Sequence, residues 1–171
     1  MNASTITRLA VLAVVATACA PRQAAPPKPD ENAIRTALTA ELAKIGPTFV
    51  AKDTAAFANM FAPDATWILP DASSFTGHAA IAAGIKRLFD SPQAMTIGQV
   101  AIDKLVVISD SEAVTFSHGE YTMAVKGKRP EARLNPFADL WKKGADGAWR
   151  IAYEVNADGP APAAPAAPAS H

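Results

Sequence analysis

The sequence predicts an α+β domain in which three N-terminal helices pack on one face of a curved antiparallel sheet. Two observations predict this class. Apolar residues recur mainly at helical spacing between residues 34 and 89, whereas segments rich in β-branched and aromatic residues follow one another from residue 97 onward. Helices that precede a run of hairpin-connected strands typically cover one face of an antiparallel sheet.

The first helix is predicted by apolar residues at helical spacing, namely Ile34, Leu38, Leu42, Ile45 and Phe49. Gly46 and Pro47 interrupt this pattern. Because proline removes one backbone hydrogen bond and crowds the preceding turn, we expect a kink at this point.

A short second helix is predicted after Asp53, whose carboxylate can cap its first turn. This helix is expected to end at Pro63-Asp64 and to bury Phe57, Met60 and Phe61. The segment from Thr66 to Leu69 then has the composition of a strand.

The third helix is predicted between Gly77 and Ser91-Pro92, with an apolar face made of Ile81, Ile85, Leu88 and Phe89. Four strands are expected after it, at residues 97–108, 113–125, 133–142 and 148–155. Turn residues separate these strands, and Gly144-Ala145-Asp146-Gly147 is the strongest hairpin signal among them.

Residues 1–18 have the pattern of a signal peptide. Arg8 is their only charge, and the apolar run from Leu9 to Val15 is too short to cross a membrane as a helix. Cleavage after Ala18 would leave Cys19, the only cysteine of the chain, as the new N-terminus. This segment resembles the bacterial lipobox, with Ala16 where that motif usually has leucine. The alternative is ordinary secretion without lipid on Cys19.

The resemblance implies that acyl chains on Cys19 anchor the protein to a membrane of the bacterial cell envelope. Ala20, rather than an aspartate, follows the cysteine. In Gram-negative lipoproteins this resembles the signal for transport to the outer membrane, so we expect an exported protein that faces the periplasm. With a single cysteine, the chain forms no intramolecular disulfide.

The sequence divides into one folded domain at residues 31–157 and two segments of low complexity. Residues 19–30 are rich in proline and are expected to be a tether, and residues 158–171 are expected to be a disordered Pro/Ala tail. Lys plus Arg and Asp plus Glu each number 16, so the formal net charge is zero, which gives no support to nucleic-acid binding.

Four motifs of the domain are informative: Phe61-Ala62-Pro63-Asp64-Ala65-Thr66, Gly77 with the helix after it, Leu140-Trp141-Lys142-Lys143, and Asp146-Gly147-Ala148-Trp149-Arg150-Ile151. In this order they resemble the SnoaL-like branch of the nuclear transport factor 2-like superfamily. The subgroup that the chain resembles most is the calcium/calmodulin-dependent kinase association-domain-like one, most members of which have no assigned function. The resemblance implies a cone-shaped fold with a cavity between helices and sheet, and homodimers formed through the other face of the sheet.

The same superfamily contains the ketosteroid isomerases, so the positions of their catalytic residues can be compared. Leu69, before Pro70, stands where those enzymes have an aspartate base, and Ile45 stands near the position of their tyrosine. Asp139 matches their second acid, a hydrogen-bond donor. Steroid isomerisation is therefore not expected. Asp139 either faces the cavity, where burial would raise its pKa, or pairs with a cation, namely Arg133, Arg150 or Lys142.

Four further residues are candidates for the ligand pocket. Alternation puts Phe116 and His118 on one face of their strand, where His118 is a base for a ligand or simply a half-exposed histidine. Trp67 lies on the strand that borders the cavity in the related proteins, or belongs to the core. Glu154 matches a position where the subgroup often has an acid, or forms a surface salt bridge.

The chemistry of the chain points to no cofactor. The histidines have no metal-ligand spacing, and the sequence has neither a phosphate-binding loop nor a serine nucleophile elbow. Three functions remain: non-catalytic binding of a small apolar or amphipathic ligand, which ranks first, an envelope association module without ligand, and an isomerase- or cyclase-type enzyme.

Overall fold

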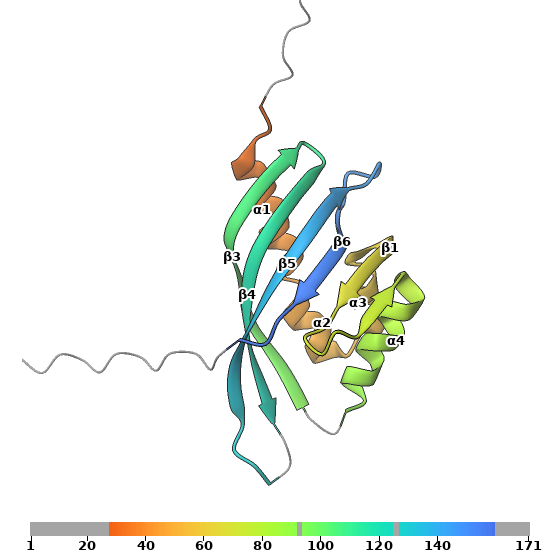
Figure 1. The fold of residues 1–171 in the computed structure, drawn as a ribbon, viewed down its shortest axis with the longest axis vertical. Coiled ribbons are helices and arrows are strands. Elements are labelled where there is room, and N and C mark those ends of the chain that lie inside the picture. Colours follow the sequence, from red (N-terminus) through yellow and green to blue (C-terminus); the bar gives the residue numbers. More distant parts are fainter. Residues whose placement is uncertain (1–27, 92–93, 125–126, 160–171) are drawn as a thin grey trace, which may run out of the picture.

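The computed structural model of the chain describes residues 28–91, 94–124 and 127–159, which form helices packed on one face of a curved six-stranded sheet (Figure 1). The helices are α1 (Glu31–Leu42), α2 (Ile45–Ala51), α3 (Thr54–Ala58) and α4 (His78–Phe89). The strands are β1 (Phe61–Ile68), β2 (Ser74–Thr76), β3 (Ala94–Ser109), β4 (Glu112–Ala124), β5 (Glu131–Lys143) and β6 (Trp149–Asn156). The predicted α+β class is confirmed.

The sheet has the strand order β2-β1-β6-β5-β4-β3. Strands β3 to β6 form the antiparallel meander that the sequence predicts. The sheet continues beyond the meander, because β1 pairs with β6 in parallel and with β2 in antiparallel orientation. The pairing of β1 with β6 places residues from the two ends of the domain side by side.

The first predicted helix is present as two helices. The break lies at Ala43 and Lys44, just before the expected kink at Gly46-Pro47. Pro47 instead lies in the first turn of α2, where backbone N–H groups have no partner inside the helix and the missing N–H of proline costs no hydrogen bond.

The second predicted helix is shorter than expected. Asp53 caps α3 as predicted, since its Oδ1 accepts hydrogen bonds from the amides of Ala55 and Ala56 at 3.1 and 2.9 Å. The prediction that Phe61 belongs to this helix was wrong, because Phe61 begins β1 and pairs with Ile151 of β6. Sheet pairing overrides the helical spacing here, and Pro63 lies where the register of the β1–β6 pair shifts.

One hydrophobic core fills the space between the helices and the sheet, and it includes the fully buried Trp141. Beneath α2, α3 and α4 the rings of Phe49, Phe57, Phe61 and Trp67 contact one another with centroid separations between 5.3 and 6.3 Å. These rings border the space described below. Among the described residues, no helix has both the length and the apolar character that a membrane span requires.

Candidate functional site

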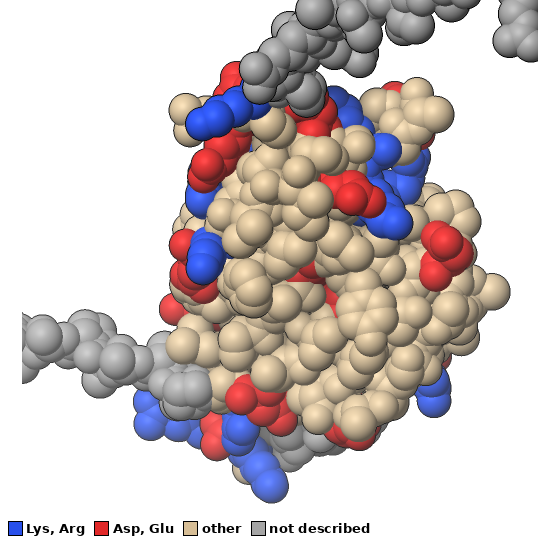
Figure 2. All heavy atoms as spheres, turned by 45° about the horizontal axis from the view of Figure 1, so that its top comes forward, with Lys and Arg blue, Asp and Glu red and all other residues tan. Residues whose placement is uncertain are grey.

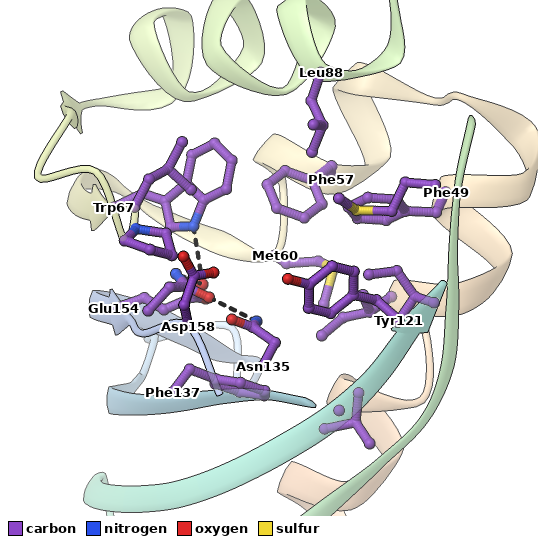
Figure 3. A pocket seen from close by; sticks show the side chains of 18 of the residues that line it. Phe49, Phe57, Met60, Trp67, Leu88, Tyr121, Asn135, Phe137, Glu154 and Asp158 are labelled. Carbon is purple, nitrogen blue, oxygen red and sulfur yellow. Dashed lines mark hydrogen bonds between the residues drawn. The ribbon is translucent and has the colours of Figure 1, made fainter. Parts of the chain in front are cut away.

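A cavity of about 430 Å³ lies between the sheet and helices α2, α3 and α4. Its walls are mostly apolar, and Figure 3 shows Phe49, Phe57 and Leu88 pointing into it from the three helices. Residues of α1 do not line it. The cavity therefore lies under α2, α3 and α4 and not under α1.

One end of the cavity is polar because a single row of residues crosses four strands there. Thr115 of β4 is paired with Asp139 of β5, Asp139 with Glu154 of β6, and Glu154 with Trp67 of β1. All four residues are buried. The parallel pairing of β1 with β6 is what brings the Trp67 indole to the two acids.

Of the two buried acids, Asp139 and Glu154, only Glu154 lines the cavity. Its Oε1 accepts hydrogen bonds from the indole N–H of Trp67 at 2.9 Å and from the side-chain amide of Asn156 at 2.6 Å (Figure 3). The Asn156 amide also donates to the carbonyl of Ile68, and its oxygen accepts from Asn135. Two donors, of which Asn156 is itself fixed by further hydrogen bonds, hold the carboxylate in one orientation.

Asp139 lies behind Glu154 and does not itself line the cavity. It is only 1% exposed, and its Oδ2 accepts a hydrogen bond from the Thr115 hydroxyl, which in turn accepts from the indole of Trp141. The expected cations are paired elsewhere, since Arg133 and Arg150 contact Glu131 and Asp146. Asp139 is therefore not part of a surface salt bridge.

The pKa values of the two neighbouring acids are both raised. Burial, together with the charge of Glu154, raises the pKa of Asp139 well above its usual range. Burial also raises the pKa of Glu154, although hydrogen bonds from Asn156, Trp67 and Asp139 oppose this shift. Asp139 Oδ1 has no hydrogen-bond partner among the described residues. When this oxygen carries a proton, it can donate a hydrogen bond to the neighbouring Glu154 carboxylate. The pair then carries one negative charge.

Several lining residues were not identified from the sequence. Tyr121, Asn135 and Asp158 point into the cavity from its other sides (Figure 3). Burial and the charge of Asp158 raise the pKa of the Tyr121 hydroxyl, so Tyr121 remains a hydrogen-bond donor. Asp158 was assigned to the tail, yet Ala157 and Gly159 on either side of it donate to carbonyls of β5. Alternate residues of a strand face the same side of the sheet. Glu154 as a pocket candidate would therefore have indicated that Asn156, two residues later on β6, also faces the cavity.

The remaining pocket candidates lie in two different places. Leu69 and Ile45, the residues that the sequence comparison matched to the base and the tyrosine of the steroid isomerases, both line the cavity as apolar side chains. Phe116 and His118 lie outside it, on the opposite face of the sheet. There Phe116 is 47% exposed and His118 Nδ1 lies 2.8 Å from Asp103 Oδ2.

No group of three or more potential metal ligands occurs within the part of the chain that the structure describes.

Comparison with protein families assigns the domain. The model of the SnoaL-like domain matches residues 46–152, a segment that contains the cavity walls from α2 to Ile151. The chain belongs to the SnoaL-like domain family. No curated protein sequence matches the chain.

Solved structures have the same fold as this SnoaL-like domain. A ketosteroid isomerase-like protein from Erwinia carotovora atroseptica is 19% identical, with a TM-score of 0.65 over 74% of this chain and 97% of that one. A candidate calcium/calmodulin-dependent protein kinase II association domain from Xanthomonas campestris is 14% identical, with a TM-score of 0.59 over 72% and 86% of the two chains.

A third structure, from Catenulispora acidiphila, was determined in complex with S-DNPA. It is 17% identical to this chain, with a TM-score of 0.60 over 75% of this chain and 95% of that one. At these identities the three comparisons establish the cone-shaped nuclear transport factor 2-like fold.

Proposed function

We propose that this SnoaL-like domain binds a small apolar or amphipathic molecule in its cavity without converting it. The cavity supports this proposal, because its volume of about 430 Å³ falls within the range of roughly 300–1,000 Å³ of small-molecule sites. Its walls are aromatic and aliphatic, and its few polar groups converge at one end. Such a site buries the hydrocarbon part of a ligand and orients a single polar group.

A neutral fluorescent probe tests this proposal. We expect N-phenyl-naphthylamine to gain fluorescence and shift to the blue when it is titrated into the purified protein. Leu88 points into the cavity from α4 (Figure 3), so Leu88→Trp should reduce probe affinity at least tenfold. Val50→Trp is the control, because Val50 is 81% exposed and lies outside the cavity. Equal affinities of the two variants would contradict the proposal.

The carboxyl pair favours a second candidate, an isomerase- or cyclase-type enzyme. Glu154 faces the cavity, and Asp139 behind it can return a proton to it, which is the arrangement a general acid requires. Incubating the protein with a molecule that it binds distinguishes the binding function from the enzyme. The binding proposal expects a bound molecule to be recovered unchanged from the wild-type protein, whereas turnover that is lost in Glu154→Gln would establish the enzyme.

The location of the domain is a separate proposal. We infer that Cys19, which lies outside the described residues, is acylated and anchors the domain to the cell envelope, with the domain in the periplasm. The expected result is that Cys19→Ser moves the protein from the membrane fraction to the soluble one. Retention of the variant on membranes would overturn the anchor.

The uncovered face of the sheet supports a homodimer. Phe116, Val106, Tyr153 and Val155 are between 41 and 47% exposed on the side away from the helices. Exposed apolar side chains that form contiguous rows are typical of protein interfaces. We infer that two copies of the domain pack through this face, which leaves both cavities accessible from the helical side.

A further inference from the structure

We infer that the cavity selects a positively charged amphipathic molecule, with an amine nitrogen held at Glu154 and a hydrocarbon part among the aromatic rings. This inference rests on the proposed binding function and names the chemical class of the ligand. It follows from three features of the cavity: the sign of the charges that line it, the partners of Glu154, and the rings beside that carboxylate.

All charged residues that line the cavity, among those that the structure describes, are acids. They are Asp71, Glu120, Glu154 and Asp158. Figure 2 shows acidic atoms recessed near the centre of one face and surrounded by uncharged residues. A hollow with charges of one sign and apolar walls concentrates the field of those charges, so it attracts cations and repels anions.

Two arginines close to the cavity do not cancel this field. Arg87 stacks on the ring of Phe75 at 5.0 Å and contributes to the lowered pKa of Asp71, after the hydrogen bonds from Ser73. Arg133 lies close enough to Asp158 to interact with its charge, but the partner of its guanidinium is Glu131 at 3.0 Å. Both arginines therefore act on the peripheral acids rather than on Glu154.

Among the described residues, Glu154 forms no salt bridge, whereas several surface acids do. Glu112 and Asp146 pair with Lys142 and Arg150. The contacts of Glu154 are the neutral donors Trp67 and Asn156 and the acid Asp139. A carboxylate that is 7% exposed and has no counter-ion is costly to bury. A ligand ammonium would supply the missing charge and recover part of this cost.

The aromatic walls suit the same ligand. The indole of Trp67 lies directly beside the Glu154 carboxylate. The ring centroids of Phe57 and Phe61 lie 5.3 and 6.3 Å from that of the Trp67 indole. The faces of such rings attract ammonium groups as well as hydrocarbon. An alcohol or phenol could also donate a hydrogen bond to Glu154, but it would leave the carboxylate without a counter-charge. A carboxylate or phosphate ligand would be repelled.

Three probes of nearly equal shape test the inference: naphthylmethylamine, naphthalenemethanol and naphthoic acid. Their dissociation constants are measured by calorimetry at neutral pH and low salt. We expect the amine to bind the wild-type protein about tenfold or more tightly than the alcohol, and naphthoic acid to bind more weakly than either. Alcohol affinity equal to that of the amine, or preferred binding of naphthoic acid, would overturn the charge selectivity while the binding function remains.

Variants assign the selectivity to the carboxylates of the cavity. Glu154→Gln should bring the affinity for the amine down to that for the alcohol, whereas Glu112→Gln, which changes a surface acid, should leave the ratio unchanged. Asp158→Asn alters an exposed lining acid and should lower the ratio by a smaller factor even if Glu154→Gln does not fold. An unchanged ratio in Asp158→Asn and Glu154→Gln would overturn the inference. Failure of all three probes to bind would overturn the proposed function with it.

Discussion

At the scale of single residues, the site depends on two acids that the sheet holds side by side. Asp139 and Glu154 are directly opposed on β5 and β6, and both are buried. Like charges at this separation in an apolar environment cannot both form cheaply, so one proton stays with the pair. The unfolded chain has no such constraint, and the titration of the pair is therefore linked to the stability of the domain.

The substitution Asp139→Asn tests this linkage. The folded pKa of Asp139 is raised above 3.8, so its contribution to the free energy of unfolding is full below that pH and is lost as the pH rises through the folded pKa. Relative to Asp139→Asn, the wild type should therefore lose stability as the pH rises above about 4, until the pH exceeds the folded pKa of Asp139. The loss should be about 1.4 kcal/mol for each pH unit that separates the unfolded from the folded pKa. Urea denaturation across this range measures the difference.

The matched control is Asp146→Asn at the surface. Arg150 lowers the pKa of Asp146 to about 2, so the contribution of Asp146 is present above its unfolded pKa and is lost as the pH falls. The two variants should thus differ from the wild type with opposite pH dependence. A difference for Asp139→Asn that is flat or increases with pH, or a carboxyl that titrates below the usual aspartate value by carbon-detected NMR, would show that Asp139 is not a protonated member of the pair.

At the scale of elements, short helices set the position of the cavity walls. Helix α3 spans only five residues and carries Phe57 to the cavity. A helix this short does not form by itself, so its cap and its packing on α4 and the sheet must hold it in place. Asp53, with two amide partners, is the cap.

The substitution Asp53→Ala tests the role of this cap. Because two amides of the first turn lose their acceptor, the free energy of unfolding should fall by about 1 kcal/mol, and the affinity for N-phenyl-naphthylamine should fall with it as Phe57 becomes less well positioned. Asp90→Ala is the comparison, since Asp90 forms only an exposed ion pair with Lys86, which contributes within about 0.5 kcal/mol. Equal losses in the two variants would argue against a special role of the cap.

The elements also show what could and could not be predicted from the sequence. Local patterns predicted the meander, the Asp53 cap and three helical regions, because spacing and turn residues act over a few positions. They did not reveal that Phe61 begins β1 or that β1 runs parallel to β6, since these depend on contacts between the two ends of the domain. For the same reason Trp67 and Glu154 were both identified as candidates, but their hydrogen bond was not.

At the scale of the whole molecule, the two faces of the sheet differ in what covers them. The helical face holds the cavity, and the other face exposes rows of apolar residues that follow the strand pairing. One such row is Val106, Val114, Leu140 and Tyr153, and a second contains Phe116, Ala138 and Val155. Phe116 belongs to this outer surface, which explains its apolar character without a role in the pocket.

The dimer proposal predicts a change of oligomeric state when this surface is charged. Phe116→Glu would bury a carboxylate in the interface without a partner, so it should shift the protein to monomers. Sedimentation velocity at micromolar concentration measures the shift. Val50→Glu, at a highly exposed residue of α2, should leave the dimer intact. A wild-type protein that sediments as a monomer would contradict the assignment of this face.

Mass spectrometry of the protein purified from the cells that produce it shows whether the cavity holds a small apolar or amphipathic molecule. Small molecules are extracted from the wild type and from Leu88→Trp and compared. We expect a molecule with a hydrocarbon part and an amine nitrogen to be released from the wild type in near-stoichiometric amount and to be depleted in the variant. Extracts of the two proteins that do not differ would contradict this expectation.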